Sequence, residues 1–222
     1  MSDRPPTSRG TRPRRAPAGR SAPSPKRGTP ERRAELLDVA VRMFYEKGYV
    51  ETTLQDIADE MGFTKPAVYY YARNKEELLV ELYGQIVTSA IDHAREIADR
   101  GGPGAERFID LVEQHLNTFL ENIEANAVFE VQRTSLSEEA KRTMVGWSRD
   151  YTAILAAVYE QGIEDGSLVH MAPRVAVNAV LGMCNTVHRW YSPRRDVSRS
   201  ELVAQLSGMV AGGLVAPPHT PR

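Results

Sequence analysis

The sequence has little of what several classes of protein require. Its single cysteine, Cys184, excludes an internal disulfide and a metal site built from thiolates. No apolar run approaches the ~18 residues that a membrane-spanning helix needs. No apolar stretch follows the basic N-terminus, so the pattern does not fit a secretory signal. These absences favour a protein of the reducing cytoplasm that has no contact with a membrane.

Signatures of catalysis are also missing. No phosphate-binding glycine loop, nucleophile–base motif or metal-spaced pair of histidines occurs. The five histidines are scattered along the chain: His93, His115, His170, His188 and His219. Cys184 and His188 fall one helical turn apart, but on a helix for which we expect a packing role, so a buried thiol is the simpler interpretation. We therefore expect no enzyme, no cofactor and no metal.

Acidic side chains are nearly absent from the first 28 residues. Asp3 is the only one there, against eight basic residues: Arg4, Arg9, Arg12, Arg14, Arg15, Arg20, Lys26 and Arg27. Since the whole chain carries a net charge of −1, the remainder is acidic. A basic arm on an acidic body is common among nucleic-acid binders. The segment also lacks large apolar residues, so we expect residues 1–28 to form a disordered basic arm; a passive leader is the alternative.

From Thr29 onward, apolar residues recur at spacings of three and four, with no strand-like alternation and no internal repeat. The pattern predicts an all-α fold of about nine helices. The first runs from the Thr29-Pro30-Glu31 start to Gly48, and the fourth from residue 74 to Gly101. The later helices are predicted at 105–121, 125–135, 138–164, 173–191 and 199–214. We expect a DNA-binding domain at 29–80, a ligand-binding and dimerisation domain at 81–214, and a disordered tail at 215–222.

Two short predicted helices, 54–61 and 64–72, are joined by a tight turn. Ala58 is a small residue where the second helix would cross the first, and Gly62 tolerates the positive φ that the turn needs. Apolar residues stand where the core between the helices requires them: Ile57, Met61, Phe63, Val68 and Tyr71. The combination predicts a helix-turn-helix unit; an ordinary helical hairpin is the alternative.

The second helix of such a unit enters the major groove of DNA. Its expected exposed residues are Thr64, Lys65, Ala67, Tyr69 and Tyr70. Lys65 can donate to guanine, Ala67 can pack against a thymine methyl group, and the tyrosines can reach phosphates or bases. Thr53 and Lys75 begin the flanking helices, where free amides favour a phosphate. For Tyr71, core packing is the better interpretation.

Residues 31–80 resemble the TetR family of bacterial regulators over about a quarter of the chain. The matching motifs are Leu36–Ala40 with Phe44 and Gly48-Tyr49, Thr52-Thr53 with Asp56–Ala58, Gly62–Lys65 with Val68–Tyr71, and Asn74–Leu78. Ala72 departs from the pattern, because the family usually has a large aromatic residue there.

The resemblance implies a homodimer that presents two recognition helices to a palindromic operator. A ligand in the body would change their spacing. The last two helices usually form the dimer interface in this family. Here Ala179, Gly182 and Met183 share one face of the predicted helix 173–191 and would allow a partner helix to approach closely. Burial of this face within one subunit is the alternative.

A ligand pocket is expected among aromatic and aliphatic residues of the middle helices that have a few polar neighbours. The candidates are His115, Phe119, Phe129, Gln132, Arg133, Trp147 and Tyr151. Plain core packing is the alternative. Residues 187–195 resemble the end of the penultimate helix in some TetR-family regulators of lipid and CoA-thioester breakdown. Arg189, Arg194 and Arg195 would there bind phosphates or form a solvated surface cluster.

Together these features predict a ligand-responsive DNA-binding regulator, a repressor released from its operator by a hydrophobic or acyl-CoA-like effector. Its expected partners are double-stranded operator DNA, a small-molecule effector and a second copy of the chain. Its expected location is the bacterial cytoplasm, in association with the nucleoid. A sequence-nonspecific architectural protein driven by the basic arm is the alternative, and it would bind DNA with a steep salt dependence and little sequence preference.

Overall fold

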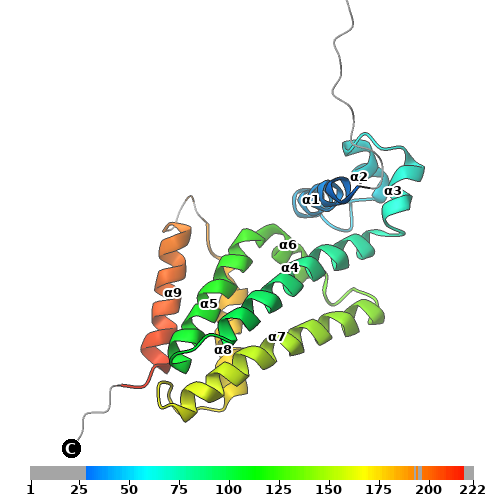
Figure 1. Ribbon diagram of the computed structural model, residues 1–222. Helices are drawn as coiled ribbons and strands as arrows, with labels where there is room; N and C mark the ends of the chain where they lie inside the picture. The colour runs from blue at the N-terminus through cyan, green and yellow to red at the C-terminus, as the bar shows by residue number, and fades with distance from the viewer. Residues whose placement is uncertain (1–28, 193, 195–196, 218–222) are drawn as a thin grey trace, which may run out of the picture.

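The computed structural model describes residues 29–192, 194 and 197–217, and this part of the chain is built almost entirely of helices (Figure 1). The elements are α1 (Pro30–Glu46), α2 (Leu54–Glu60), α3 (Lys65–Tyr71), α4 (Lys75–Ala98), α5 (Gly104–Glu121), α6 (Ile123–Gln132), α7 (Glu138–Glu164), α8 (Pro173–Asn185), the 3-10 helix η1 (Val187–Arg189) and α9 (Arg199–Leu214). The prediction of an all-α fold is confirmed. The basic arm at 1–28 lies outside the described residues, as does Arg195.

The helices begin where short-range hydrogen bonds satisfy their first amides. Thr29 and Asn74 accept from backbone amides three residues on, and Thr53 and Ser198 form complete capping boxes. Gly62 has the positive φ of 64° that the helix-turn-helix requires. These local signals account for the agreement between the predicted and observed helix starts.

Helix 125–135 is observed at Ile123–Gln132, and two other predicted boundaries are wrong for reasons that the structure shows. Helix 173–191 ends at Asn185, because the Thr186 hydroxyl donates to the Met183 carbonyl oxygen (2.9 Å) and His188 Nδ1 bonds the Asn185 carbonyl oxygen (2.9 Å). Such side-chain bonds compete with the helical ladder. The expected tail also starts too early, since Val215 bridges to Leu168 in the turn after α7. Residues 218–222 lie outside the described part.

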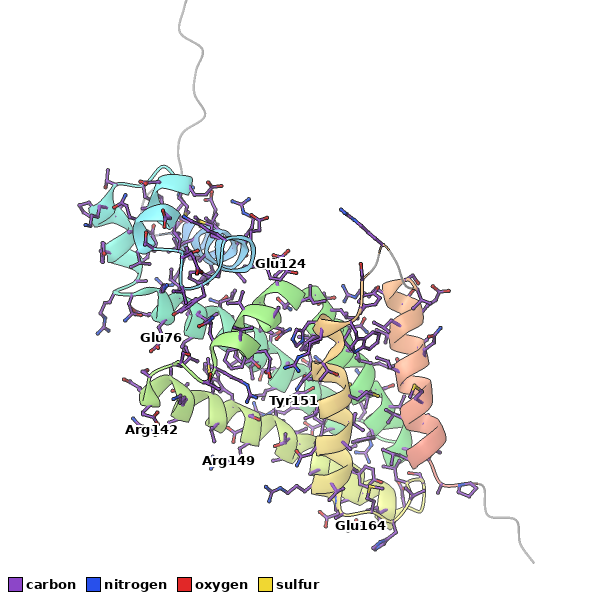
Figure 2. All side chains as sticks on the ribbon, turned by 180° about the vertical axis from the view of Figure 1, so that it is seen from behind. Glu76, Glu124, Arg142, Arg149, Tyr151 and Glu164 are labelled. Carbon is purple, nitrogen blue, oxygen red and sulfur yellow. The ribbon has the colours of Figure 1, made fainter. Side chains whose placement is uncertain are left out.

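The apolar interior forms two clusters, and the first joins the head (residues 29–80) to the body (residues 81–214). This cluster contains the buried faces of α1–α3 and the start of α4, but also Val128 on α6 and Met144 on α7. Glu76 adds a polar link near the start of α7, where its carboxylate accepts from the Ser137 amide (2.9 Å) and hydroxyl (2.6 Å) (Figure 2). Helix α4 runs through the boundary without a break, so a rearrangement in the body can reach the head.

The second cluster fills the body between α4, α5, α7, α8 and α9. Leu111, Leu155 and Tyr159 are among its fully buried side chains. Helices α5 and α7 cross at two glycines, Gly104 and Gly162, which allow the backbones to touch. No helix in the described part has the length and apolarity to cross a membrane.

Candidate DNA-binding surface and effector pocket

Helices α2 and α3 form the predicted helix-turn-helix, and their shared core fixes the direction of α3. Ile57, Ala58 and Val68 are completely buried between them. Tyr71 is also buried and stacks on Phe63 with ring centroids 5.7 Å apart, as expected for a core residue. The outward face of α3 is therefore held rigidly by the packing of its inward face.

The outward face of α3 carries four of the five residues predicted to be exposed there. Thr64, Lys65, Tyr69 and Tyr70 all face solvent, and Tyr70 is 75% exposed. Ala67 is buried, so the prediction of an exposed alanine is wrong. The reason is helical geometry, because Ala67 lies one turn before Tyr71 on the packed face. Ala67 is therefore a packing residue.

Thr53 and Lys75 are the remaining predicted DNA contacts. Thr53 is exposed at the start of α2 and is held by its capping box with Asp56. Lys75 points inward, and its ammonium group donates to backbone carbonyl groups of the α1–α2 loop. Arg73, which was not among the predicted contacts, has a side chain that is 91% exposed between α3 and α4 and lies 3.9 Å from Glu77. Its position two residues after α3 was the sequence signal that made it a candidate.

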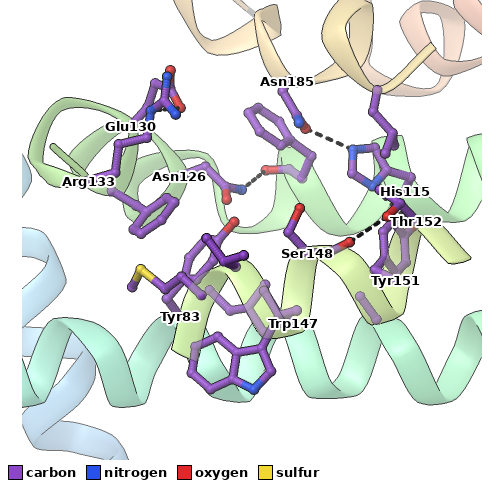
Figure 3. A pocket seen from close by; sticks show the side chains of 18 of the residues that line it. Tyr83, His115, Asn126, Glu130, Arg133, Trp147, Ser148, Tyr151, Thr152 and Asn185 are labelled. Carbon is purple, nitrogen blue, oxygen red and sulfur yellow. Dashed lines mark hydrogen bonds and ion pairs between the residues drawn. The ribbon is translucent and has the colours of Figure 1, made fainter. Parts of the chain in front are cut away.

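A cavity of about 660 Å³ opens between α4, α5, α6, α7 and α8 (Figure 3). Its volume lies within the range of small-molecule sites. Six of the seven predicted pocket residues line it: His115, Phe119, Phe129, Arg133, Trp147 and Tyr151. Gln132 does not, because α6 turns Asn126, Phe129, Glu130 and Arg133 toward the cavity at helical spacing and Gln132 falls outside that stripe.

The inner part of the cavity contains a hydrogen-bonded trio of polar side chains. His115 Nε2 lies 2.9 Å from Asn185 Oδ1, and His115 Nδ1 lies 3.1 Å from the Tyr151 hydroxyl. Since an amide oxygen only accepts, Nε2 carries the proton and Tyr151 donates to Nδ1. Burial lowers the pKa of His115 and raises the pKa of Tyr151. The imidazole is therefore neutral and fully bonded.

The outer part of the cavity carries charge. Arg133 lines it from an exposed position at the end of α6, and the half-buried Lys141, which lies 3.0 Å from Glu138, lines it from the start of α7. Glu130 lies 3.3 Å from Arg133 and 3.6 Å from Arg189, so it partly neutralises both. Arg189 and Arg194 are both exposed, which fits either expectation for these arginines, a phosphate contact or a solvated surface cluster.

Several lining residues were missed from the sequence: Tyr83, Asn126, Glu130, Ser148, Thr152 and Asn185. Tyr83 on α4 stacks on Phe129 on α6 with centroids 3.8 Å apart, which joins the cavity wall to the helix that enters the head. No group of His, Cys, Asp or Glu among the described residues is arranged to hold a metal ion.

The predicted dimer residues lie at the surface of the subunit. Ala179 and Gly182 are exposed on α8, and Met183 is half-buried. This face of α8 is therefore not fully buried within one subunit. Val175 on α8 and Met209 on α9 are large apolar residues that are also exposed, at 58% and 66%. Figure 2 shows α8 running across the outside of the body. Both α8 and α9 therefore present exposed apolar side chains.

A helix-turn-helix head on a helical body with an internal cavity defines a one-component transcriptional regulator, which binds both DNA and a small molecule. Comparison with known families agrees with this class. The family model for the tetracyclin repressor-like C-terminal domain matches residues 101–214, and that for bacterial regulatory proteins of the tetR family matches residues 36–82. The chain belongs to the TetR family, whose members are DNA-binding transcription factors and not enzymes.

Similar proteins are matched over nearly their whole length. The transcriptional repressor KstR2 of Rhodococcus jostii is 26% identical over 86% of this chain and 94% of that protein. A TetR/AcrR-family regulator from Thermobifida fusca is 38% identical over 82% of this chain and 98% of that chain, with a TM-score of 0.69. The structure of AibR in complex with isovaleryl coenzyme A and operator DNA shares the fold at 21% identity, covering 80% of this chain and 97% of that chain, with a TM-score of 0.66.

Proposed function

We propose that this protein is a homodimeric repressor that leaves its operator when an acyl-coenzyme A thioester occupies the cavity between α4 and α8. The observation that carries the proposal is the make-up of the cavity wall, which combines apolar side chains and a buried polar trio with the cationic side chains of Arg133 and Lys141. A regulator of this kind works on the chromosome, so we place it in the bacterial cytoplasm.

The cavity suits the two parts of a thioester. Apolar side chains from three helices can enclose an acyl chain: Ile86, Val87, Ala90, Met144 and Leu181. Arg133 and Lys141 stand where coenzyme A phosphates would leave the cavity, and an arginine is well suited to bind phosphate. AibR, a regulator with this fold, forms a complex with isovaleryl coenzyme A and operator DNA, which supports the same ligand class here.

The connection between α4 and the head supplies the response. Trp147 packs against Gly84 of α4 so closely that a β-carbon there would lie 2.7 Å from the indole ring. A ligand that displaces Trp147 or Tyr83 therefore acts directly on α4, whose first turn belongs to the head. A ligand that binds one orientation of α4 better than another shifts the population toward that orientation.

Tryptophan fluorescence tests the proposal, because the chain has two tryptophans and Trp190 is 53% exposed outside the cavity lining. In the Trp190→Phe variant, isovaleryl-CoA and longer acyl-CoAs should change the emission of Trp147 and release labelled operator DNA. Arg133→Ala with Lys141→Ala should weaken the response to acyl-CoA and leave the response to the free acid unchanged. If no acyl-CoA changes either signal, the ligand class is wrong.

A further inference from the structure

Lys75 is the first residue of α4, and its side chain crosses to the loop between α1 and α2. Its ammonium nitrogen donates to the carbonyl oxygens of Val50 (3.0 Å) and Thr52 (3.1 Å), and also to that of Tyr49. The nitrogen lies 4.4 Å from the centroid of the Tyr49 ring. An ammonium group has three hydrogens to donate, so these three carbonyl groups use its full capacity.

The loop depends on this contact. No other group in the part of the chain that the structure describes donates to the carbonyl oxygens of Tyr49, Val50 and Thr52. The buried Thr52 holds the other side, where its hydroxyl donates to the Gly48 carbonyl oxygen (2.7 Å). Without the ammonium group, the three loop carbonyl groups would have only water as a hydrogen-bond donor. The loop would then lose its ordered conformation.

Lys75 also spans the helix-turn-helix. The loop that it holds leads directly into α2, and Lys75 itself follows α3 after three residues, Ala72–Asn74. One side chain therefore ties the entry of the motif to its exit. We propose that Lys75 is a positioning residue for operator binding, which orders the α1–α2 loop and thereby α2 and α3, and that it makes no phosphate contact.

The two roles differ in how operator binding depends on salt. A lysine that neutralises a phosphate contributes about 0.9 to the slope of log affinity against log salt, and a positioning residue contributes nothing to it. We expect Lys75→Met to weaken operator binding about tenfold through the lost charge-assisted bonds, with the slope unchanged. In the free protein, the amides of residues 49–53 should exchange with solvent faster than in the wild type.

Lys65→Met is the matched control, since it makes the same chemical change at an exposed position on α3. If Lys65 contacts a phosphate, the slope of log affinity against log salt should fall by about 0.9 in Lys65→Met. If Lys65 contacts a base, the operator affinity should fall and the slope should stay the same. In both cases the loop amides should exchange as slowly as in the wild type. This control shows that amide exchange in the loop responds to Lys75 and not to any lost lysine.

Lys75→Arg decides the question even if Lys75→Met fails to fold. A guanidinium group serves a phosphate at least as well as an ammonium group, but its planar fork cannot gather three carbonyl groups around one nitrogen. We expect the arginine variant to bind the operator more weakly with an unchanged slope and faster loop exchange. Wild-type affinity in Lys75→Arg, or a slope lowered by about 0.9 in Lys75→Met with protected loop amides, would overturn the proposal.

Discussion

Tyr70 is 75% exposed on α3, against 49% for the neighbouring Tyr69. Its ring contacts the buried Tyr71 edge to face at 5.3 Å, so the side chain is held at its base and free at its hydroxyl. We expect Tyr70→Ala to reduce operator affinity about fivefold or more, because a good base contact contributes roughly 1–3 kcal/mol. Fluorescence anisotropy with labelled operator measures the loss. Tyr45→Ala, at an exposed tyrosine of α1, serves as the control, and equal affinity in both variants would contradict the assignment.

His115 is a residue whose protonation the fold opposes. Burial lowers its pKa from the ordinary value of 6.5, while the neighbouring Tyr151 and Cys184 have raised pKa values and do not titrate in this range. The unfolded chain then takes up a proton before the folded chain does. The stability contributed by neutral His115 is therefore complete above pH 6.5 and is lost as the pH falls toward the lower folded pKa.

Thermal unfolding between pH 5 and 7.5 measures this effect. The difference in free energy of unfolding between the wild type and His115→Gln should be constant above about pH 7. It should shrink below pH 6.5, by at most about 1.4 kcal/mol per pH unit for one proton. His93→Gln makes the same substitution at an exposed position on α4 and serves as the control. Parallel curves for the wild type and His115→Gln would show that the histidine is not buried in its neutral form.

At the scale of elements, the crossing of α5 and α7 depends on the absence of side chains. A β-carbon on Gly104 would lie 2.3 Å from the Gly162 Cα and 2.4 Å from its nitrogen, both backbone atoms that cannot move aside. We expect Gly104→Ala to lower the free energy of unfolding by about 1–3 kcal/mol, the usual cost of overpacking. Chemical denaturation measures the change.

Gly146 provides the matched control for this prediction. It lies inside α7, and a β-carbon there would meet no atom within 4 Å. Because glycine is a poor helix former, Gly146→Ala should raise the free energy of unfolding by about 0.5–1 kcal/mol. The two substitutions add the same methyl group. If they change the free energy of unfolding in opposite directions, the difference is due to the close approach of the α5 and α7 backbones at Gly104. A higher free energy of unfolding in Gly104→Ala would mean that the backbones of α5 and α7 are not in close contact at this point.

The elements that could be predicted from sequence are those with local causes. The helix starts at Thr29, Thr53 and Ser198 follow from capping residues, and the turn at Gly62 follows from its conformational freedom. The C-terminus of α8 was missed, because side-chain bonds after Asn185 replace the helical ladder and apolar periodicity carries no sign of them.

In the candidate sites, too, residues placed by helical spacing could be predicted, and residues placed by tertiary contacts could not. The pattern of aromatic and polar residues placed six of the residues that line the cavity, since helical spacing sets which side chains share a face. Lys75 could not be placed, because its partners are loop carbonyl groups whose positions depend on the fold of the whole head. Asn185 was missed for a related reason, since it reaches His115 only after α5 and α8 have packed together.

At the scale of the molecule, each subunit offers one recognition helix. Members of this family act as homodimers, so two heads meet one operator and their separation decides the fit. Helix α4 joins the cavity wall to the head, while α8 and α9 carry the exposed apolar surface. The parts that would sense the effector, bind DNA and dimerise are thus separate surfaces of one helical framework, and each can be altered alone.

We expect the surface of α8 and α9 to form the dimer interface through Ala179, Gly182 and Met183. The two small residues are exposed and let a partner helix approach, and Val175 and Met209 extend the apolar area. A two-fold interface presents the same patch twice, so one substitution acts twice. Ala179→Glu or Met183→Glu would place unpaired carboxylates in that interface, at a cost of several kcal/mol. Either variant should become monomeric or aggregate and should lose operator binding, although every residue of α3 is intact.

Sedimentation velocity reports the mass of each variant, and anisotropy reports its affinity for the operator. Arg142→Glu on the exposed face of α7 is a suitable control, because it adds negative charge away from α8 and α9 and should leave a dimer. Far-ultraviolet circular dichroism separates a folded monomer from a misfolded chain. A folded Ala179→Glu variant that sediments as a tight dimer would place the interface elsewhere, and the exposed surface of α8 and α9 would then need another partner.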